Sequence, residues 1–190
     1  CLLSRGLGDV YKRQELTLIT GNKDKVREFS QILGDDFTIN NVKIDLEEIQ
    51  STDVRKVVSH KLQQAYQQLK TPVLVEDTGI HIQTLNGFPG ALIKSFWEHL
   101  RNEGITRIAG LSPINALTII GYHDGEKMYF FQGKSTGCIP QVPAEGGFGW
   151  DGIFVPIGYN KSYGQMTPEE KNKISQRSKA LDELKKFFQK

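Results

Sequence analysis

The chain has 190 residues, of which 24% are charged and 38% are hydrophobic, as is ordinary for a globular protein. This length suits one α/β domain with a substantial core and is short for two independent domains. No apolar run approaches the roughly 18 residues that span a bilayer, which argues against a transmembrane helix and predicts a soluble protein without membrane partners.

Residues Cys1–Gln14 differ from the rest of the chain because they show neither helical nor strand periodicity. We expect them to be an artefactual leader that is foreign to the fold, leaving residues 15–190 as a single domain. A signal peptide is the alternative, but Leu2–Leu3 is much shorter than the apolar core of such a peptide.

Removing this leader makes the predicted domain electrically neutral. It subtracts three basic residues and one acidic residue from totals of 24 and 22, which cancels the formal net charge of +2. A neutral domain argues against nucleic-acid binding, and the Lys-rich C-terminal segment is typical of a solvated helix face. The two cysteines, Cys1 and Cys138, provide no disulfide framework and fit a reducing cytoplasm.

The first part of the predicted domain alternates strands with helices. Glu15–Thr20 has the pattern of a short apolar strand, which is followed by a helix over Asn22–Leu33 and a strand over Phe37–Ile44. A longer helix is predicted over Asp53–Leu69, because its apolar residues fall on one helical stripe.

The middle of the chain combines a buried strand with glycine-rich turns. Val73–Glu76 is a continuous apolar strand that we expect to end in a turn at Asp77–Gly79. The loop Asn86–Gly90 precedes a helix with apolar residues between Ile93 and Leu100. Open α/β sheets place their sites at strand ends, so the turn after this strand is a candidate site.

A hairpin and a terminal helix complete the predicted fold. Strands over Asn115–His123 and Glu126–Gly133 flank Asp124-Gly125, a dipeptide that favours a two-residue type I′ turn. The glycine-rich segment Glu145–Asp151 is irregular, and Thr167–Lys190 is expected to be helical. The hairpin makes part of the sheet antiparallel, so the pattern predicts an α/β fold with a mixed sheet flanked by helices.

Two groups of residues suit phosphate and metal binding. Thr20–Lys25 places a glycine and an amide where a strand turns into a helix, whose free N–H groups attract anions, although Asn22 is equally a helix N-cap. Asp77 is the favoured carboxylate after the buried strand, although an aspartate there can simply form the turn. Three acidic residues after the second strand provide oxygen ligands for a hard cation: Asp45, Glu47 and Glu48.

Two further segments suit a purine base. Phe148–Asp151 combines aromatic rings, flexible backbone and a carboxylate, which fits stacking on a flat base, with core packing as the alternative. The segment Glu170–Arg177 is rich in donors, and Arg177 can bind a carbonyl or phosphate oxygen.

These segments stand in one order along the chain, and together they resemble the inosine triphosphate pyrophosphatase family. The resemblance runs from about Leu16 to the C-terminus, and several motifs in register are more specific than any one of them. The motifs are Thr20–Lys25, Val75–Gly79, Gly87–Gly90, Phe148–Asp151 and Glu170–Arg177.

The resemblance implies two lobes with a deep substrate cleft, built on a mixed central sheet flanked by helices. It implies a cytoplasmic homodimer that uses Mg²⁺ to hydrolyse ITP, dITP and XTP to the nucleoside monophosphate and pyrophosphate. A 6-oxo purine offers an acceptor to donors in the base site, whereas adenine offers an amino donor that would leave those donors unpaired.

The resemblance also implies roles for individual residues. Asp77 corresponds to the metal-associated catalytic carboxylate and Glu48 to the second metal ligand, while Thr78 contacts the substrate. The phosphate-binding positions are Thr20, Gly21, Asn22, Lys23, Asp24, Lys25, Lys61 and Lys94. The base-binding positions are Phe148, Gly149, Trp150, Asp151, Lys171, Gln176 and Arg177.

One position departs from the family pattern. Gln176 stands where the family has a histidine between a serine and an arginine. Glutamine can still donate to a carbonyl but cannot become cationic, so the base preference or its pH dependence is expected to differ.

Three alternatives follow from the same residues. A pyrophosphatase of the related Maf type would prefer modified pyrimidine nucleotides. A nucleotide-binding sensor would bind without turnover, but it would not need the acidic pair Glu48 and Asp77. A nucleic-acid-binding module is suggested only by the basic C-terminal segment, Phe148 and Trp150.

Overall fold

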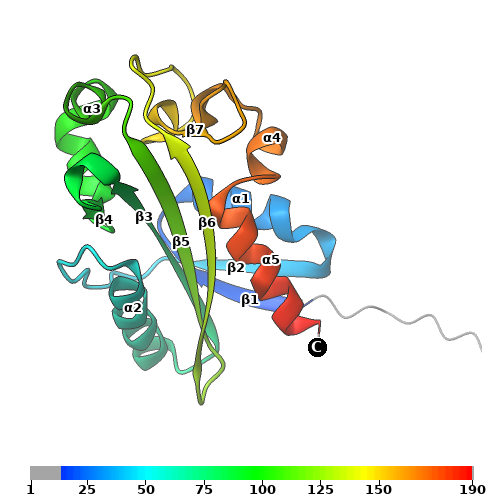
Figure 1. Cartoon of the computed structure of the whole chain (residues 1–190). Helices are drawn as coiled ribbons and strands as arrows, with labels where there is room; N and C mark the ends of the chain where they lie inside the picture. Colours follow the sequence, from blue (N-terminus) through cyan, green and yellow to red (C-terminus); the bar gives the residue numbers. More distant parts are fainter. Residues whose placement is uncertain (1–13, 190) are drawn as a thin grey trace, which may run out of the picture.

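A seven-stranded mixed sheet forms the centre of the computed structural model, which describes residues 14–189 (Figure 1). The strand order is β2-β1-β3-β5-β6-β7, and β4 pairs with β3. The strands are β1 (Gln14–Ile19), β2 (Phe37–Val42), β3 (Val73–Ile82), β4 (Pro89–Gly90), β5 (Pro113–His123), β6 (Met128–Cys138) and β7 (Val155–Pro156).

The pairing confirms the predicted mixed sheet. β1 runs parallel to β2 and β3, whereas β5 is antiparallel to β3 and β6 is antiparallel to β5. Gln14, which we expected to end the leader, belongs to β1 and pairs with Phe37 of β2, so β1 begins one residue before the predicted strand. The rest of the expected leader, residues 1–13, lies outside the described residues.

Five α-helices surround the sheet in the described part of the chain (Figure 1). They are α1 (Lys23–Leu33), α2 (Val54–Leu69), α3 (Ile93–Ala109), α4 (Pro168–Asn172) and α5 (Gln176–Phe188). Short 3-10 helices connect several of these elements. Within residues 14–189, no helix is both long and apolar enough to cross a membrane.

The alternation of side chains in β3 explains how the helices cover both faces of the sheet. Leu74 packs with α1 and α5 in one buried cluster, while Val73 and Val75 pack with α2 in another. Adjacent residues of a strand point to opposite faces, so a continuous apolar strand requires a cover on each side.

A third core cluster forms a separate lobe at the far end of the same long strands. Ile80 and Ile82 of β3 pack there with α3 and with Phe154 and Tyr163. In Figure 1 this lobe, with α3, β7 and α4, is drawn at the top, and α1, α2 and α5 lie below it. The expected two-lobed arrangement is therefore built on strands that run through both lobes.

The expected end of β3 at Glu76 is wrong. The strand continues through Asp77 and Gly79 to Ile82 because β5 pairs with it along this whole length. Gly79 allows close packing rather than a turn: a Cβ atom there would lie 2.4 Å from Cγ2 of Val54 and 2.9 Å from the carbonyl carbon of Gly90. Asp77 therefore lies in the middle of a strand.

Two other local predictions are corrected. Four residues, Asp124–Lys127, join the hairpin strands, and of these only Gly125 has a positive φ, which excludes a type I′ turn. The side chain of Asp124 closes the loop by accepting from the backbone N–H groups of Glu126 and Lys127, each at 2.7 Å.

The C-terminal segment is not one helix. It divides into α4 and α5 because Ser175 adopts an extended conformation, and its side chain accepts a hydrogen bond from the N–H of Ser178. This break starts a new helix at Gln176, directly beside the cavity described below.

Candidate active site

A cavity of about 800 Å³ lies where the two lobes meet, between the core cluster of the upper lobe and the cluster that contains α2. Segments distant in the sequence line it: the β1–α1 turn, the loop after β2, the middle of β3, the start of α3, the glycine-rich loop before β7, and the residues from α4 to α5. The predicted site residues that line it are Thr20, Gly21, Asn22, Lys25, Glu48, Lys61, Asp77, Thr78, Lys94, Phe148, Gly149, Trp150, Asp151, Lys171, Gln176 and Arg177.

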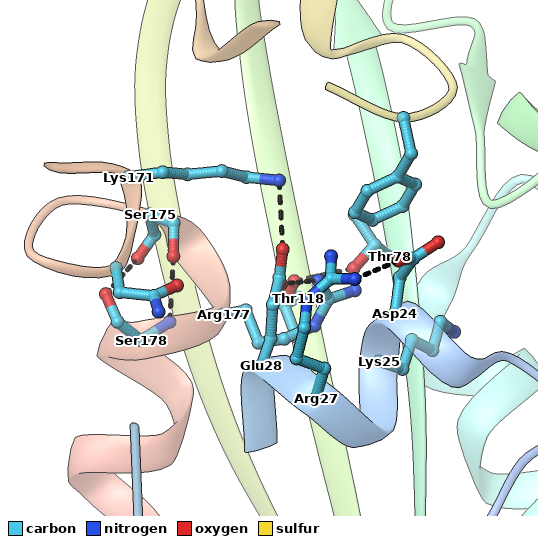
Figure 2. A network of polar contacts seen from close by, with 12 residues as sticks. Asp24, Lys25, Arg27, Glu28, Thr78, Thr118, Lys171, Ser175, Arg177 and Ser178 are labelled. Atoms are coloured by element: carbon cyan, nitrogen blue, oxygen red, sulfur yellow. Dashed lines mark hydrogen bonds and ion pairs between the residues drawn. The ribbon is translucent and has the colours of Figure 1, made fainter. Parts of the chain in front are cut away.

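Two predicted phosphate-binding residues, Lys23 and Asp24, do not line the cavity. The side chain of Asn22 caps α1 by accepting from the N–H groups of Asp24 and Lys25, at 2.9 Å and 3.3 Å. In the first turn that follows, Asp24 pairs with Arg27 at 2.7 Å (Figure 2). Lys25 instead reaches inward, where its Nζ lies 2.8 Å from Oε2 of Glu76.

The two predicted metal ligands share one ammonium group. Nζ of Lys61, on α2, forms an ion pair with Glu48 and lies 3.3 Å from Oδ2 of Asp77. Burial lowers the pKa of Lys61, but the two carboxylates outweigh this effect and hold the pKa above its usual value. Burial likewise opposes ionisation of Glu48, yet Lys61 keeps its pKa below the usual value.

Thr78 is held by the sheet rather than being free. Its hydroxyl donates to Oε1 of Glu76 at 2.7 Å and lies 2.6 Å from Oγ1 of Thr118 on β5. Its N–H donates to Oδ1 of Asp77 at 2.8 Å, which fixes that carboxylate against the strand. These bonds orient the two neighbouring carboxylates on opposite sides of β3.

A buried network of charges closes the other end of the cavity (Figure 2). Lys171 Nζ lies 3.1 Å from Oε1 of Glu28 and 2.9 Å from Oδ2 of Asp151. Arg177 forms an ion pair with Glu28 through Nη1, and its Nη2 lies 3.2 Å from Oε1 of Glu76. Three carboxylates are thus matched with two cations here, and Lys25 supplies a third cation at Glu76.

Burial and the ion pairs of this network shift the pKa values of its three carboxylates. Burial works against ionised Glu76, but Arg177 and Lys25 lower its pKa to about 2. Burial also opposes the charge on Glu28, and Arg177 and Lys171 hold that pKa below its usual value. Burial prevails at Asp151, whose pKa is raised although Lys171 is adjacent.

Aromatic rings form the wall beside this network. Nζ of Lys171 lies 4.6 Å from the ring centroid of Phe148, a cation–π geometry. The N–H of Phe148 donates to Oδ2 of Asp151 at 3.1 Å. Trp150 lines the cavity and also packs edge-on against Phe154 in the upper core. The two alternatives that the sequence left open for this residue, a position in the site and core packing, therefore both apply.

Sequence reasoning missed several residues of the cavity. Glu28 does not itself line the cavity, but it is the most important residue that was missed, because it pairs with both Lys171 and Arg177 although it follows an ordinary charged stretch of α1. Its position next to buried Phe29 and three residues after Lys25 was the available signal. Trp97 and Glu98, from α3, line the cavity without having been singled out.

The residues present fit a divalent cation only in part. Among residues 14–189, no group of three or more His, Cys, Asp or Glu side chains is placed to hold a metal by itself. Glu48 and Asp77 nevertheless converge on one cation, the Lys61 ammonium. Two carboxylates suit Mg²⁺ when substrate phosphates and water supply the other ligands.

Comparison with known proteins agrees with this arrangement. A sequence model of the Ham1 family matches residues 16–187. Inosine triphosphate pyrophosphatase from Kluyveromyces lactis is 39% identical over 93% of this chain and 96% of the relative. Inosine triphosphate pyrophosphatase 2 from Trypanosoma cruzi is 39% identical over 92% of each chain.

Solved structures show the same fold. The structure of a HAM1 protein from Coxiella burnetii superposes with a TM-score of 0.80 at 22% identity, covering 93% of this chain and 98% of the other. The family match spans every residue that lines the cavity. The chain therefore belongs to the Ham1 family.

Proposed function

We propose that this chain hydrolyses non-standard purine nucleoside triphosphates, namely ITP, dITP and XTP, to the nucleoside monophosphate and pyrophosphate. The observation that carries the proposal is one cavity with two chemically different ends. Glu48, Lys61 and Asp77 provide charge for a triphosphate at one end, and Phe148 and Arg177 provide a ring and a buried cation at the other. The names of the curated relatives support the same reaction.

In the proposed reaction, water attacks the α-phosphorus and the bond to the bridging oxygen of the β-phosphate breaks. Asp77 orients the water and takes its proton, since its carboxylate is fixed by the Thr78 N–H. Pyrophosphate leaves in one piece, and its charge is stabilised by the cavity lysines. These lysines are Lys25, Lys61 and Lys94.

Glu48 and Asp77 would hold Mg²⁺ together with phosphate oxygens. A bound Mg²⁺ supplies Lewis-acid stabilisation of the charge on those oxygens. In this structure the Lys61 ammonium neutralises the carboxylates of Glu48 and Asp77. If Mg²⁺ took its place between them, the ammonium would be free to bind a phosphate.

At the base end, Phe148 stacks on the purine, while Lys171, Gln176 and Arg177 face its 6-position. Lys171 and Arg177 are held by carboxylates in advance, so little reorganisation is needed when a base binds. We further propose that residues 15–190 act as one catalytic domain. From the family resemblance we also propose a cytoplasmic homodimer, which light scattering and fractionation of cells would test.

Pyrophosphate release from ITP, dITP, XTP, GTP, ATP and dTTP, measured with and without Mg²⁺, tests the proposal. We expect selective release from the first three, with the nucleoside monophosphate as co-product and dependence on Mg²⁺. A preference for dTTP or methylated UTP would indicate Maf-type activity. Binding without turnover would indicate a sensor, and release of single phosphates would contradict cleavage between the α- and β-phosphates.

A further inference from the structure

The side chain of Gln176 is buried in the cavity with unused hydrogen-bonding capacity. The residue is only 2% exposed, and it lines the cavity at the first position of α5. Within residues 14–189, no group donates a hydrogen bond to its Oε1. A buried acceptor without a donor costs free energy, so a group of this kind in a cavity points to a ligand that supplies the donor.

The backbone holds Gln176 firmly in this position. A Cβ atom on Gly133 of β6 would lie 2.0 Å from the carbonyl oxygen of Gln176 and 2.5 Å from the N of Ala180, so the start of α5 rests directly on the strand. The side chain of Ser175 also accepts from the N–H of Ser178 at 3.1 Å. The carboxamide therefore projects from a rigid support, as recognition of a small ligand requires.

The neighbouring donors are already engaged. Lys171 contacts Glu28 and Asp151, and both terminal nitrogens of Arg177 contact carboxylates. Of the three side-chain nitrogens of Arg177, only Nε is buried and has no acceptor within residues 14–189. In the described part of the chain, the buried polar atoms without a hydrogen-bond partner thus include an acceptor, Oε1 of Gln176, and a donor, Nε of Arg177, on adjacent residues that both line the cavity.

This pair of groups matches the edge of a 6-oxo purine, which carries the acceptor O6 next to the donor N1–H. We propose that Oε1 of Gln176 accepts a hydrogen bond from N1–H of the base. The inference rests on the proposed function and deepens it by naming the atom that is read. It also changes the role expected from the sequence, in which Gln176 donates to the 6-oxygen.

The proposed contact separates purines in a specific way. Adenine has an unprotonated N1, so ATP would leave Oε1 of Gln176 facing a second acceptor. Guanine has an N1–H group like hypoxanthine, so this contact does not reject GTP. Discrimination against GTP must therefore come from another part of the cavity.

The test compares kcat/KM for ITP and N1-methyl-ITP in the wild type, Gln176→Met and Gln176→Glu at pH 8. Methionine keeps the length of the side chain without the acceptor, whereas an ionised glutamate keeps the acceptor and removes the donor. We expect Gln176→Met to lose about tenfold or more with ITP, and Gln176→Glu, which keeps an acceptor, to lose clearly less than Gln176→Met.

The methylated substrate checks the same contact on the unmodified protein. The wild type should lose about tenfold or more on N1-methyl-ITP, and Gln176→Met should show a much smaller difference between the two substrates. Steric exclusion of the methyl group would instead persist in Gln176→Met, because methionine is as long as glutamine. That result would overturn the inference.

The other outcomes are equally distinct. Equal losses in Gln176→Met and Gln176→Glu would show that Gln176 donates to the base, and unchanged activity in both would show that it only packs. Either result overturns the inference while the proposed function stands. Absence of ITP turnover by the wild type would overturn both. Circular dichroism and thermal melting of each variant verify that it is folded.

Discussion

Asp77 is the side chain on which the proposed hydrolysis depends most directly. Its carboxylate is fixed between the N–H of Thr78 and the ammonium of Lys61. Replacement by asparagine keeps the size of the side chain but removes the base. We expect Asp77→Asn to lower kcat for ITP by at least about 100-fold, measured as pyrophosphate release.

Asp45 provides a matched control for this substitution. It is a carboxylate that also lines the cavity. The sequence made it a candidate cation ligand, but the proposed reaction assigns the cation to Glu48 and Asp77 and gives Asp45 no role. Asp45→Asn should retain most of the activity, and both variants should melt close to the wild-type temperature. Normal turnover by Asp77→Asn would contradict the proposed role of this residue.

Glu28 differs from Asp77, because it pairs with both Lys171 and Arg177 and has no assigned step in the proposed hydrolysis. Glu28→Gln removes one charge from a buried network and leaves Lys171 and Arg177 under-compensated. We expect the free energy of unfolding to fall by about 3–5 kcal/mol in denaturant titrations. The exposed pair of Asp24 with Arg27 on the same helix is the comparison, and Asp24→Asn should cost about 0.5 kcal/mol or less.

If Glu28→Gln were as stable as Asp24→Asn, the network would not contribute to folding.

Enzyme kinetics on the folded Glu28→Gln variant separate an effect on substrate binding from an effect on the chemical step. A rise in KM for ITP with a smaller change in kcat is expected, because the displaced cations face the base rather than the phosphates.

At the scale of single elements, the helices and strands were largely predictable and their ends were not. Apolar periodicity predicted β1, α1, β2 and α2 within a few residues. It failed at Asp77–Gly79, because a local pattern cannot show that β5 pairs with β3 through that segment. The sequence alone does not distinguish a glycine that permits close packing from a glycine that permits a turn.

The same limitation explains which site residues were found. Motifs at the ends of elements were recognisable because they combine unusual residue types, and most of these residues line the cavity. Glu28 has no such motif, since its partners Lys171 and Arg177 are more than a hundred residues away in the sequence. Only the packing of α1 against α5 brings them together.

A substitution at Gly133 of β6 tests whether the close packing of α5 against this strand positions the residues of α5 that line the cavity. A methyl group at this position would collide with backbone atoms of Gln176 and Ala180, which cannot move without shifting the helix. We expect Gly133→Ala to lower thermal stability and to raise KM for ITP. Lys134→Ala, at an exposed neighbouring position, should change neither. Wild-type KM in a folded Gly133→Ala would mean that the cavity does not depend on this packing.

At the scale of the whole molecule, the buried charges connect elements that are far apart in the sequence. Glu28 comes from α1, Glu76 from β3, Lys171 from α4 and Arg177 from α5. The network thus links the lobe that contains α4 to the elements of the other lobe. Its protonation state is therefore expected to affect the stability of the fold as well as the site.

Acid should consequently destabilise the whole protein. The pKa of Glu76 falls from 4.5 to about 2 on folding, because Arg177 and Lys25 outweigh burial, and this difference corresponds to about 3 kcal/mol. A lowered pKa in the folded state means that the stabilisation is present above pH 4.5 and is lost as the pH falls towards 2. The pKa of Glu28 is lowered in the same direction, whereas the raised pKa of Asp151 gives a contribution of opposite sign.

Denaturant unfolding between pH 7 and pH 2.5 measures this dependence, with Glu76→Gln as the decisive variant. Glutamine cannot be protonated, so the variant should be less stable at neutral pH and should lose less stability on acidification. The two curves are expected to converge at low pH, where Glu76 of the wild type takes up its proton and the charge of Arg177 is compensated less in both proteins. Parallel curves would show that carboxylates other than Glu76 determine the acid stability of the fold.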